Sequence, residues 1–191
     1  GGAEAVRNAG QFLRAGADAV KIEGGEEYAD VVRSFVRAGI PVMGHVGLTP
    51  QKHKVLGGYR LVGRTSAEAA QVVRDAEAIA EAGAFSIVIE YTASEVAKVI
   101  TERVGVPTIC IGSGPHCDGQ VLVFHDIVGL SESPPPFAKA YVNLAAEILD
   151  AIRRYKDEVE SGAFPDEGRY WHMKEGELEK LLKALGVEKA S

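Results

Sequence analysis

The sequence predicts an α/β protein in which βα units build a parallel sheet. Short apolar segments alternate along the chain with longer amphipathic segments of helical period. Because parallel strands need a crossover connection, this alternation indicates βαβ units with helices covering the strands. Several apolar segments also end in glycine or ionisable residues, and barrel active sites are assembled from such strand ends. We therefore favour a (β/α)8 TIM barrel over an open, doubly wound sheet.

The individual elements follow from period, caps and breakers. The expected strands are 18–23, 40–46, 85–90, 107–114 and 120–126, and the expected helices are 4–15, 26–38, 66–82, 93–104, 137–160 and about 175–185. Thr65 with Glu68, and Thr92 with Glu95, form capping-box patterns. The stretch 47–66 has no regular period and is long enough for a lid or binding loop.

Composition narrows the class of function. The chain has 191 residues, 46% of them hydrophobic, and a net charge of −6. This acidic balance without a basic stripe argues against nucleic acid as a partner. We expect no membrane span and no signal peptide, and hence a cytoplasmic location. The spacing of Cys110 and Cys117 matches no metal or redox motif, so we expect two structural cysteines and no disulfide scaffold.

The segment DAVKIEGG at 18–25 places charge in an apolar strand. Residues two apart in a strand share a face, so Lys21 and Glu23 point the same way while Val20 and Ile22 pack on the other side. A buried charge is costly unless it is paired, binds a metal or meets a charged ligand. A purely structural Lys21–Glu23 pair is one interpretation. The glycines that follow, which would let backbone approach a ligand, favour a binding site.

Other strand ends carry ionisable residues as well. Glu90 ends the apolar strand FSIVIE, where partial burial would suit it to proton transfer, although a solvated carboxylate is the alternative. His45 in GHVGLTPQ could orient a substrate or could be a core residue. For His125-Asp126 a structural role is the simpler interpretation, and the GSG turn at 112–114 is a weak phosphate signal. Spacing indicates no nucleophilic triad and no zinc motif, but a hard metal held by carboxylates stays open.

Several motifs in this order resemble one family. The segments ADAVKIEGG, IPVMGHVGLTPQ, LGGYRLVGR, AGAFSIVIE, PTICIGSG and CDGQVLVFHD are similar to those of the ketopantoate hydroxymethyltransferases, from about residue 4 to about 165. The resemblance implies a barrel of the phosphoenolpyruvate/pyruvate type. It implies a barrel domain at 1–165 that lacks the first three strands, with their two metal-binding aspartates, and a C-terminal helical extension at 166–191.

The resemblance also implies roles and a reaction. Glu23 resembles the family's Mg²⁺ ligand, Lys21 the lysine that binds the α-keto acid, and Glu90 the proton acceptor, while His45 would make a supporting contact. The implied reaction moves a hydroxymethyl group from 5,10-methylenetetrahydrofolate to 3-methyl-2-oxobutanoate through a Mg²⁺-stabilised enolate. The product is 2-dehydropantoate (ketopantoate), a precursor in pantothenate and coenzyme A biosynthesis. A large homo-oligomer is implied too.

Two alternatives remain open at this stage. The first is a Mg²⁺-dependent C–C lyase of the same superfamily, which would not depend on folate. The second is a non-catalytic fragment or subunit, because five strands do not close an eight-stranded barrel and an open sheet exposes two edges.

Overall fold

The computed structural model describes residues 2–52 and 60–187, and the chain divides into two compact units. The first unit is Gly1–Ile127 with Ser131–Ala140, and the second is Val128–Leu130 with Tyr141–Ser191. Residues 53–59 of the expected lid, which include the first four residues of the LGGYRLVGR motif, lie outside the described residues. The domain boundary near 165 stays a prediction.

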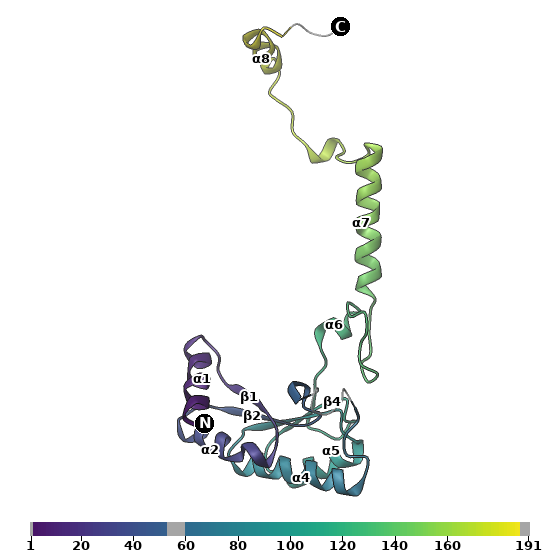
Figure 1. Ribbon diagram of the computed structural model, residues 1–191. Helices are drawn as coiled ribbons and strands as arrows, with labels where there is room; N and C mark the ends of the chain where they lie inside the picture. Colours follow the sequence, from purple (N-terminus) through teal and green to yellow (C-terminus); the bar gives the residue numbers. More distant parts are fainter. Residues whose placement is uncertain (1, 53–59, 188–191) are drawn as a thin grey trace. The chain divides into compact units, whose positions relative to one another are not determined.

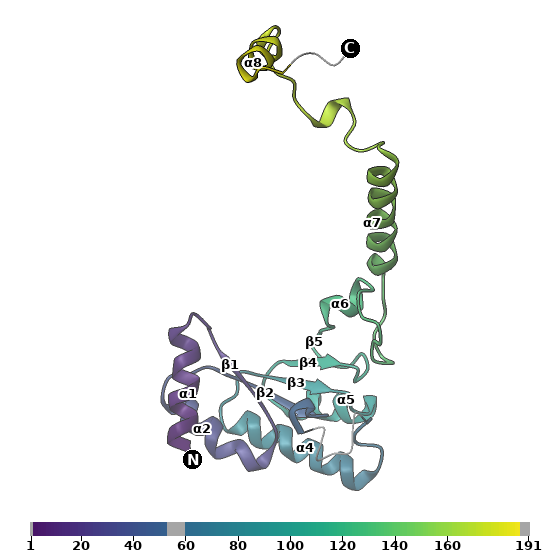
Figure 2. The same cartoon turned by 45° about the horizontal axis from the view of Figure 1, so that its top comes forward.

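The first unit is built on a five-stranded parallel sheet (Figures 1 and 2). Its strands, which neighbour one another in chain order, are β1 (Val20–Glu23), β2 (Val42–Gly47), β3 (Ser86–Glu90), β4 (Thr108–Ile111) and β5 (Gly119–Gln120). In a doubly wound sheet the strand order reverses at a switch point, whereas barrel strands follow one another around the wall. The observed order is therefore that of a barrel wall, and it confirms the expected α/β fold of about five βα units.

Helices cover one face of this sheet. They are α1 (Gly2–Arg14), α2 (Ala29–Arg37) after the 3₁₀ turn η1 (Glu26–Tyr28), α4 (Ser66–Glu81) and α5 (Ser94–Arg103). Figure 1 shows α2, α4 and α5 along the same side of the strands. Between the layers lie fully buried side chains, including Val32, Ile79, Ile87, Ile89 and Ile100. Burying each such side chain stabilises the fold by about 1.5–3 kcal/mol, so this face holds the unit together.

The strand register assigns the ionisable residues to the opposite face. Lys21 is aligned with Met43, Glu23 with His45, and Gly47 with Glu90. Neighbouring partners in a sheet point to the same side, and side chains alternate along each strand. One face therefore carries, in register, Lys21, Glu23, Met43, His45, Val88, Glu90, Ile109 and Ile111. The charged face expected from DAVKIEGG is confirmed.

One of the expected helix caps is confirmed and the other is wrong. Thr65 caps α4, because its hydroxyl accepts a hydrogen bond from the Glu68 N–H at 3.3 Å. The N-cap residue of α5 is Ala93, which makes no side-chain cap. The Thr92 hydroxyl instead donates to the Glu90 carbonyl at 3.0 Å. The two capping-box patterns therefore differ in outcome, because the Thr92 hydroxyl bonds to the carbonyl of Glu90 at the end of β3 and not to the helix.

Two further expectations are wrong in their extent. The strand expected at 120–126 is limited to β5. The chain then forms the short helix α6 (Phe124–Ile127), in which the Asp126 N–H donates a hydrogen bond to the Val123 carbonyl. The helix expected at 137–160 is α7 (Leu144–Ser161). It begins at Asn143, whose side chain accepts from the Ala146 N–H at 3.2 Å and so fixes the start.

The second unit is helical. It contains α7, the 3₁₀ turn η3 (Glu167–Arg169) and α8 (Glu177–Leu185), which falls within the expected 175–185 segment. Tyr155 of α7 packs edge-on against Phe164, with ring centroids 5.4 Å apart. Across both units, none of the described helices has the length and apolar character that a membrane span needs.

A disulfide joins Cys110 and Cys117, contrary to the expectation of two separate structural cysteines. Cys110 is fully buried in β4 and Cys117 lies seven residues later, before β5. The two Cα atoms are 5.6 Å apart, which suits a disulfide. Spacing alone could not reveal this pair, because the chain reversal between β4 and β5 brings the residues together. The bond closes the loop that carries Ser113.

Breaking this disulfide should lower stability. Closing a short loop restricts the unfolded chain, so Cys117→Ser should cost about 2–3 kcal/mol of unfolding free energy. Urea unfolding of both proteins without reductant measures the difference, and dithiothreitol should bring the parent protein down to the level of the variant. A count of two free thiols in the unreduced, denatured parent protein would contradict the disulfide.

Asp118, the residue before β5, is hydrogen-bonded to Thr108, the first residue of β4. Its Oδ2 accepts hydrogen bonds from the Thr108 N–H at 2.8 Å and from the Thr108 hydroxyl at 3.1 Å. These bonds favour the charged form, the backbone bond most strongly, and lower the pKa of Asp118. A lowered folded-state pKa gives stability that is present above the unfolded-state value and lost as the pH falls through the folded-state value.

The stability difference between the parent protein and Asp118→Ala should therefore depend on pH. We expect a lower melting temperature for the variant at pH 7, and a difference that narrows below about pH 4, near the ordinary aspartate pKa. Thermal melts followed by circular dichroism at both pH values measure it. Asp157→Ala, at an exposed helical position, is the control and should change little. A difference that stays constant into acid would refute this role.

Candidate active site

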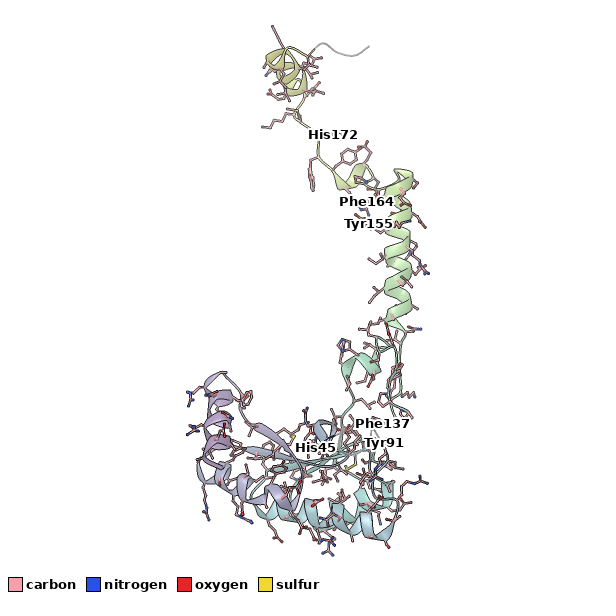
Figure 3. The ribbon with its side chains drawn as sticks, viewed as in Figure 1. His45, Tyr91, Phe137, Tyr155, Phe164 and His172 are labelled. Atoms are coloured by element: carbon pink, nitrogen blue, oxygen red, sulfur yellow. A yellow bond between two sulfur atoms is a disulfide. The ribbon has the colours of Figure 1, made fainter. Side chains whose placement is uncertain are left out.

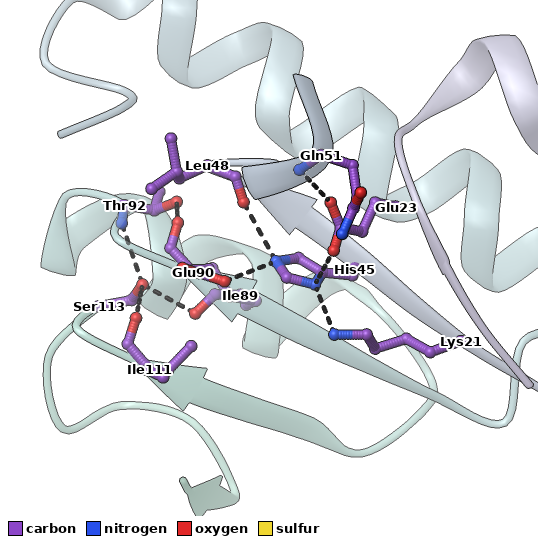
Figure 4. Close-up of polar contacts among 10 residues, drawn as sticks. All are labelled: Lys21, Glu23, His45, Leu48, Gln51, Ile89, Glu90, Thr92, Ile111 and Ser113. Carbon is purple, nitrogen blue, oxygen red and sulfur yellow. Dashed lines mark hydrogen bonds and ion pairs between the residues drawn. The ribbon is translucent and has the colours of Figure 1, made fainter. Parts of the chain in front are cut away.

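The imidazole of His45 lies at the centre of the ionisable cluster (Figure 4). The residue is 1% exposed. Its Nδ1 lies 3.2 Å from Lys21 Nζ and 3.8 Å from Glu23 Oε1, and its Nε2 lies 3.1 Å from Glu90 Oε2. The four site residues expected from sequence are thus brought together, with His45 in contact with the other three.

The contact with Lys21 determines which nitrogen of the His45 ring carries the proton. An ammonium group only donates hydrogen bonds, so the contact with Lys21 makes Nδ1 of His45 the acceptor. The proton of the neutral ring then lies on Nε2, which is 3.1 Å from the Leu48 carbonyl and equally close to Glu90. A structural Lys21–Glu23 pair is not formed in the part of the chain that the structure describes, because Lys21 contacts His45 instead.

Glu23 is held at the end of β1 by the following loop. Its Oε2 accepts a hydrogen bond from the backbone N–H of Gln51 at 3.0 Å. Gln51 belongs to the 3₁₀ turn η2 (Pro50–Lys52), which follows β2. The first residues of the expected lid therefore fix the carboxylate. The side chain of Glu23 is 14% exposed, so the group stays reachable from solvent.

Glu90 is positioned by residues that sequence reasoning missed. Thr92 donates its hydroxyl to the Glu90 carbonyl, and Ser113 accepts from the Thr92 N–H at 3.0 Å while donating to the Ile89 carbonyl at 2.9 Å. Ser113 is buried and lies in the loop closed by the disulfide. The only feature of the sequence that could have indicated the role of Ser113 is its place between two glycines after a strand.

Three members of the cluster, Lys21, His45 and Glu90, face a cavity of about 580 Å³ on the open side of the sheet, here called the sheet cavity. Glu23 lies outside its lining and borders a neighbouring cavity together with Lys21. The lining of the sheet cavity includes Lys21, Met43, His45, Val88, Glu90, Ile109, Ile111 and Val123. Small-molecule sites typically measure about 300–1,000 Å³ and combine apolar walls with a few polar groups. This cavity has that composition, and Lys21 gives it a cation suited to an anionic ligand.

The glycines near the site make room for protein side chains. At Gly24 and Gly25, an added Cβ would lie 2.3 Å from the Tyr28 ring and 2.0 Å from the Asp75 carboxyl group. At Gly112 it would lie 2.5 Å from the Phe137 ring. Close packing therefore accounts for these glycines, and the weak phosphate signal of the GSG turn gains no support.

The neighbouring His125-Asp126 pair separates into an exposed and a buried residue. His125 contacts the ring of Phe124 at its edge. Asp126 is 6% exposed and accepts a hydrogen bond from the Ser131 hydroxyl at 2.5 Å. Asp126 also lines a second cavity next to Glu90.

The donor set fits magnesium only in part. Mg²⁺ usually takes one or two carboxylates, with substrate and water oxygens completing the site. Glu23 provides one carboxylate of this kind at a strand end. No group of three potential ligands lies together within residues 2–52 and 60–187. Glu23 could thus hold an ion only with ligands from elsewhere.

A parallel βα sheet in chain order, with ionisable side chains at its strand ends, is the arrangement of barrel-type enzymes, and this chain has it. The sequence model of the ketopantoate hydroxymethyltransferase family matches residues 1–167. The chain belongs to this family.

Curated relatives agree with this assignment. A 3-methyl-2-oxobutanoate hydroxymethyltransferase of Hyperthermus butylicus is 60% identical over 188 residues, which cover 98% of this chain and 65% of the relative. The enzymes of that name from Ignicoccus hospitalis and Sulfolobus acidocaldarius are each 61% identical, covering 88% and 87% of this chain and 64% and 62% of their own lengths. The chain thus spans somewhat less than two thirds of these relatives.

Similarity to solved structures is weaker. A crystal structure of phosphonopyruvate hydrolase matches 97% of this chain and covers 64% of its own, with a TM-score of 0.46 and 17% identity. A match at this level does not bear on function.

Replacing His45 tests whether it holds the cluster together. His45→Ala would remove the ring that bonds to the Leu48 carbonyl in a buried hydrogen bond and contacts Lys21 and Glu90, which should cost about 1–3 kcal/mol of unfolding free energy. His172→Ala, at an exposed histidine, is the matched control and should stay within about 0.5 kcal/mol. Urea unfolding measures both, and equal small effects would show that the His45 contacts contribute nothing.

Proposed function

We propose that this chain carries a large part of the active site of a 3-methyl-2-oxobutanoate hydroxymethyltransferase. The enzyme would transfer a hydroxymethyl group from 5,10-methylenetetrahydrofolate to 3-methyl-2-oxobutanoate and form 2-dehydropantoate for pantothenate and coenzyme A biosynthesis. The observation that carries the proposal is the contact of one buried histidine with Lys21, Glu23 and Glu90, because Lys21, His45 and Glu90 also line one cavity. The names of the relatives support the choice of reaction.

The residues of the sheet cavity suit an anionic keto acid. The Lys21 ammonium would attract the carboxylate of 3-methyl-2-oxobutanoate and stabilise negative charge that develops on the keto oxygen. Val88, Ile109 and Ile111 would contact the isopropyl group. Glu90, beside them, is in a position to take the proton from C3.

His45 would act as a positioning residue. It links Lys21 to Glu90 through opposite ring nitrogens, so the cation and the base keep a fixed separation. A fixed separation matters because catalysis depends on groups that are oriented before the substrate arrives. Glu23 would supply one ligand to Mg²⁺, and the bound ion would polarise the keto acid as a Lewis acid.

The proposed reaction balances with one water molecule. The C3–H bond breaks and C3 bonds to the methylene carbon of the donor. Both carbon–nitrogen bonds of that methylene break, and water gives it a hydroxyl group. The proton from C3 and the second proton from water replace the methylene on the two nitrogens, which yields tetrahydrofolate. Glu90 would relay these protons.

The setting of the reaction is also proposed. Mg²⁺ and the folate donor follow from the family resemblance, as do a cytoplasmic location and assembly into a homo-oligomer. Small molecules are the proposed ligands, with no nucleic acid or membrane involved.

Substitution of Glu90 is the direct test. With 3-methyl-2-oxobutanoate, 5,10-methylenetetrahydrofolate and Mg²⁺, the chain should form ketopantoate, and Glu90→Gln should lower kcat by about 10²- to 10⁴-fold. Glu95→Gln, at an exposed glutamate in the first turn of α5, is the matched control and should keep full activity.

Other outcomes separate the alternatives. Equal activity of Glu90→Gln and the control would remove Glu90 from the mechanism. Cleavage of a keto acid without folate would favour the lyase. Absence of both activities, together with no binding of the keto acid in calorimetry, would favour a non-catalytic role.

A further inference from the structure

We propose that a second cavity, on the other side of Glu90, binds the planar ring of the one-carbon donor. This cavity, here called the Tyr91 cavity, measures about 510 Å³, and its lining includes Glu90, Tyr91, Asp126, Pro135, Pro136 and Phe137. The inference rests on the proposed function, because it assigns the place of the second substrate.

The two cavities share a wall. Glu90, Ile111 and Val123 line both of them. Of these two cavities, Lys21 and His45 line the sheet cavity and not the Tyr91 cavity. Transfer of a one-carbon unit requires both substrates within reach of the group that moves the proton. Glu90 is the ionisable residue common to the two cavities, so it meets this requirement.

The charges assign one substrate to each cavity. Lys21 and His45 make the sheet cavity favourable for the keto acid, which is an anion. Among the residues that the structure describes, the lining of the Tyr91 cavity contains Glu90 and Asp126 and no basic side chain. An anion there would meet two carboxylates, whereas a ring that donates hydrogen bonds would be favoured.

The aromatic wall of the Tyr91 cavity suits a flat ring. Tyr91 and Phe137, labelled in Figure 3, have centroids 5.1 Å apart and planes inclined by 53°. Phe137 also packs closely over the backbone of Gly112, which limits its movement. Pro135, Pro136 and Leu48 add apolar surface. Rigid aromatic and proline surfaces bind planar heterocycles by stacking and apolar contact.

Asp126 gives the cavity a directional contact. It is buried, and Oδ1 is occupied by the Ser131 hydroxyl. No described residue donates a hydrogen bond to Oδ2. An ionised carboxylate only accepts hydrogen bonds, so its ligand must donate. The N–H and amino groups of a reduced pterin ring are donors of this kind.

Calorimetry with two ligands tests this assignment. The ligands are 5-formyltetrahydrofolate, a donor analogue that carries no transferable methylene, and 3-methyl-2-oxobutanoate. Phe137→Leu and Asp126→Asn should each weaken binding of the folate analogue about 10-fold. Both should leave the Kd of the keto acid within about twofold of the parent value, because neither residue lines the sheet cavity. Lys21→Ala should give the opposite pattern.

Control variants keep the test decisive. Tyr155→Leu removes a comparable aromatic contact in the second unit and should change neither affinity. Circular-dichroism melts verify that each variant folds, and Phe137→Tyr, which retains the ring, should bind the analogue almost normally.

Failure of the parent protein to bind the analogue, or parent-like affinity in Phe137→Leu and Asp126→Asn, would overturn the inference. Ketopantoate formation with unchanged folate affinity in both variants would refute this site alone. Selective loss of folate binding without any ketopantoate formation would refute the proposed function alone.

Discussion

The candidate site depends on one interaction, the placement of the His45 imidazole between Lys21 on one side and Glu90 on the other. Lys21 is exposed and Glu90 is partly buried, and the buried ring gives both of them a polar partner with one side chain. The backbone carbonyl of Leu48 completes the contacts of the ring. Because His45 is almost fully buried, its orientation is set by packing as well as by hydrogen bonds.

The pleat and register of the parallel sheet make this placement possible. Residues aligned in neighbouring strands point to the same side, so charge on β1, imidazole on β2 and carboxylate on β3 emerge on one face. The opposite face is apolar and packs under the helices. Core side chains and candidate-site side chains therefore alternate along the same strands. A shift of one residue in register would place the charges in the core.

This alternation also explains how far the sequence could be interpreted. Lys21, Glu23 and Glu90 stand out because each interrupts or ends an apolar strand, and the parallel fold follows from the alternation of elements. The role of Thr92 could not be predicted, since its capping pattern equals that of Thr65 and only the nearby Glu90 carbonyl distinguishes the two. The Cys110–Cys117 disulfide and the burial of Asp126 likewise depend on chain reversals that local patterns do not specify.

The position of the ring proton of His45 is the most direct test of the Lys21–His45–Glu90 cluster. Since Lys21 can only donate, we predict that the ring carries its proton on Nε2 and none on Nδ1. Long-range proton–nitrogen NMR of the uniformly ¹⁵N-labelled protein distinguishes the two nitrogens, and His45→Gln assigns the signal. The predicted result is a slowly exchanging Nε2–H tautomer. A proton on Nδ1 would mean that Lys21 does not contact the ring, and it would contradict the cluster on which the proposed function depends.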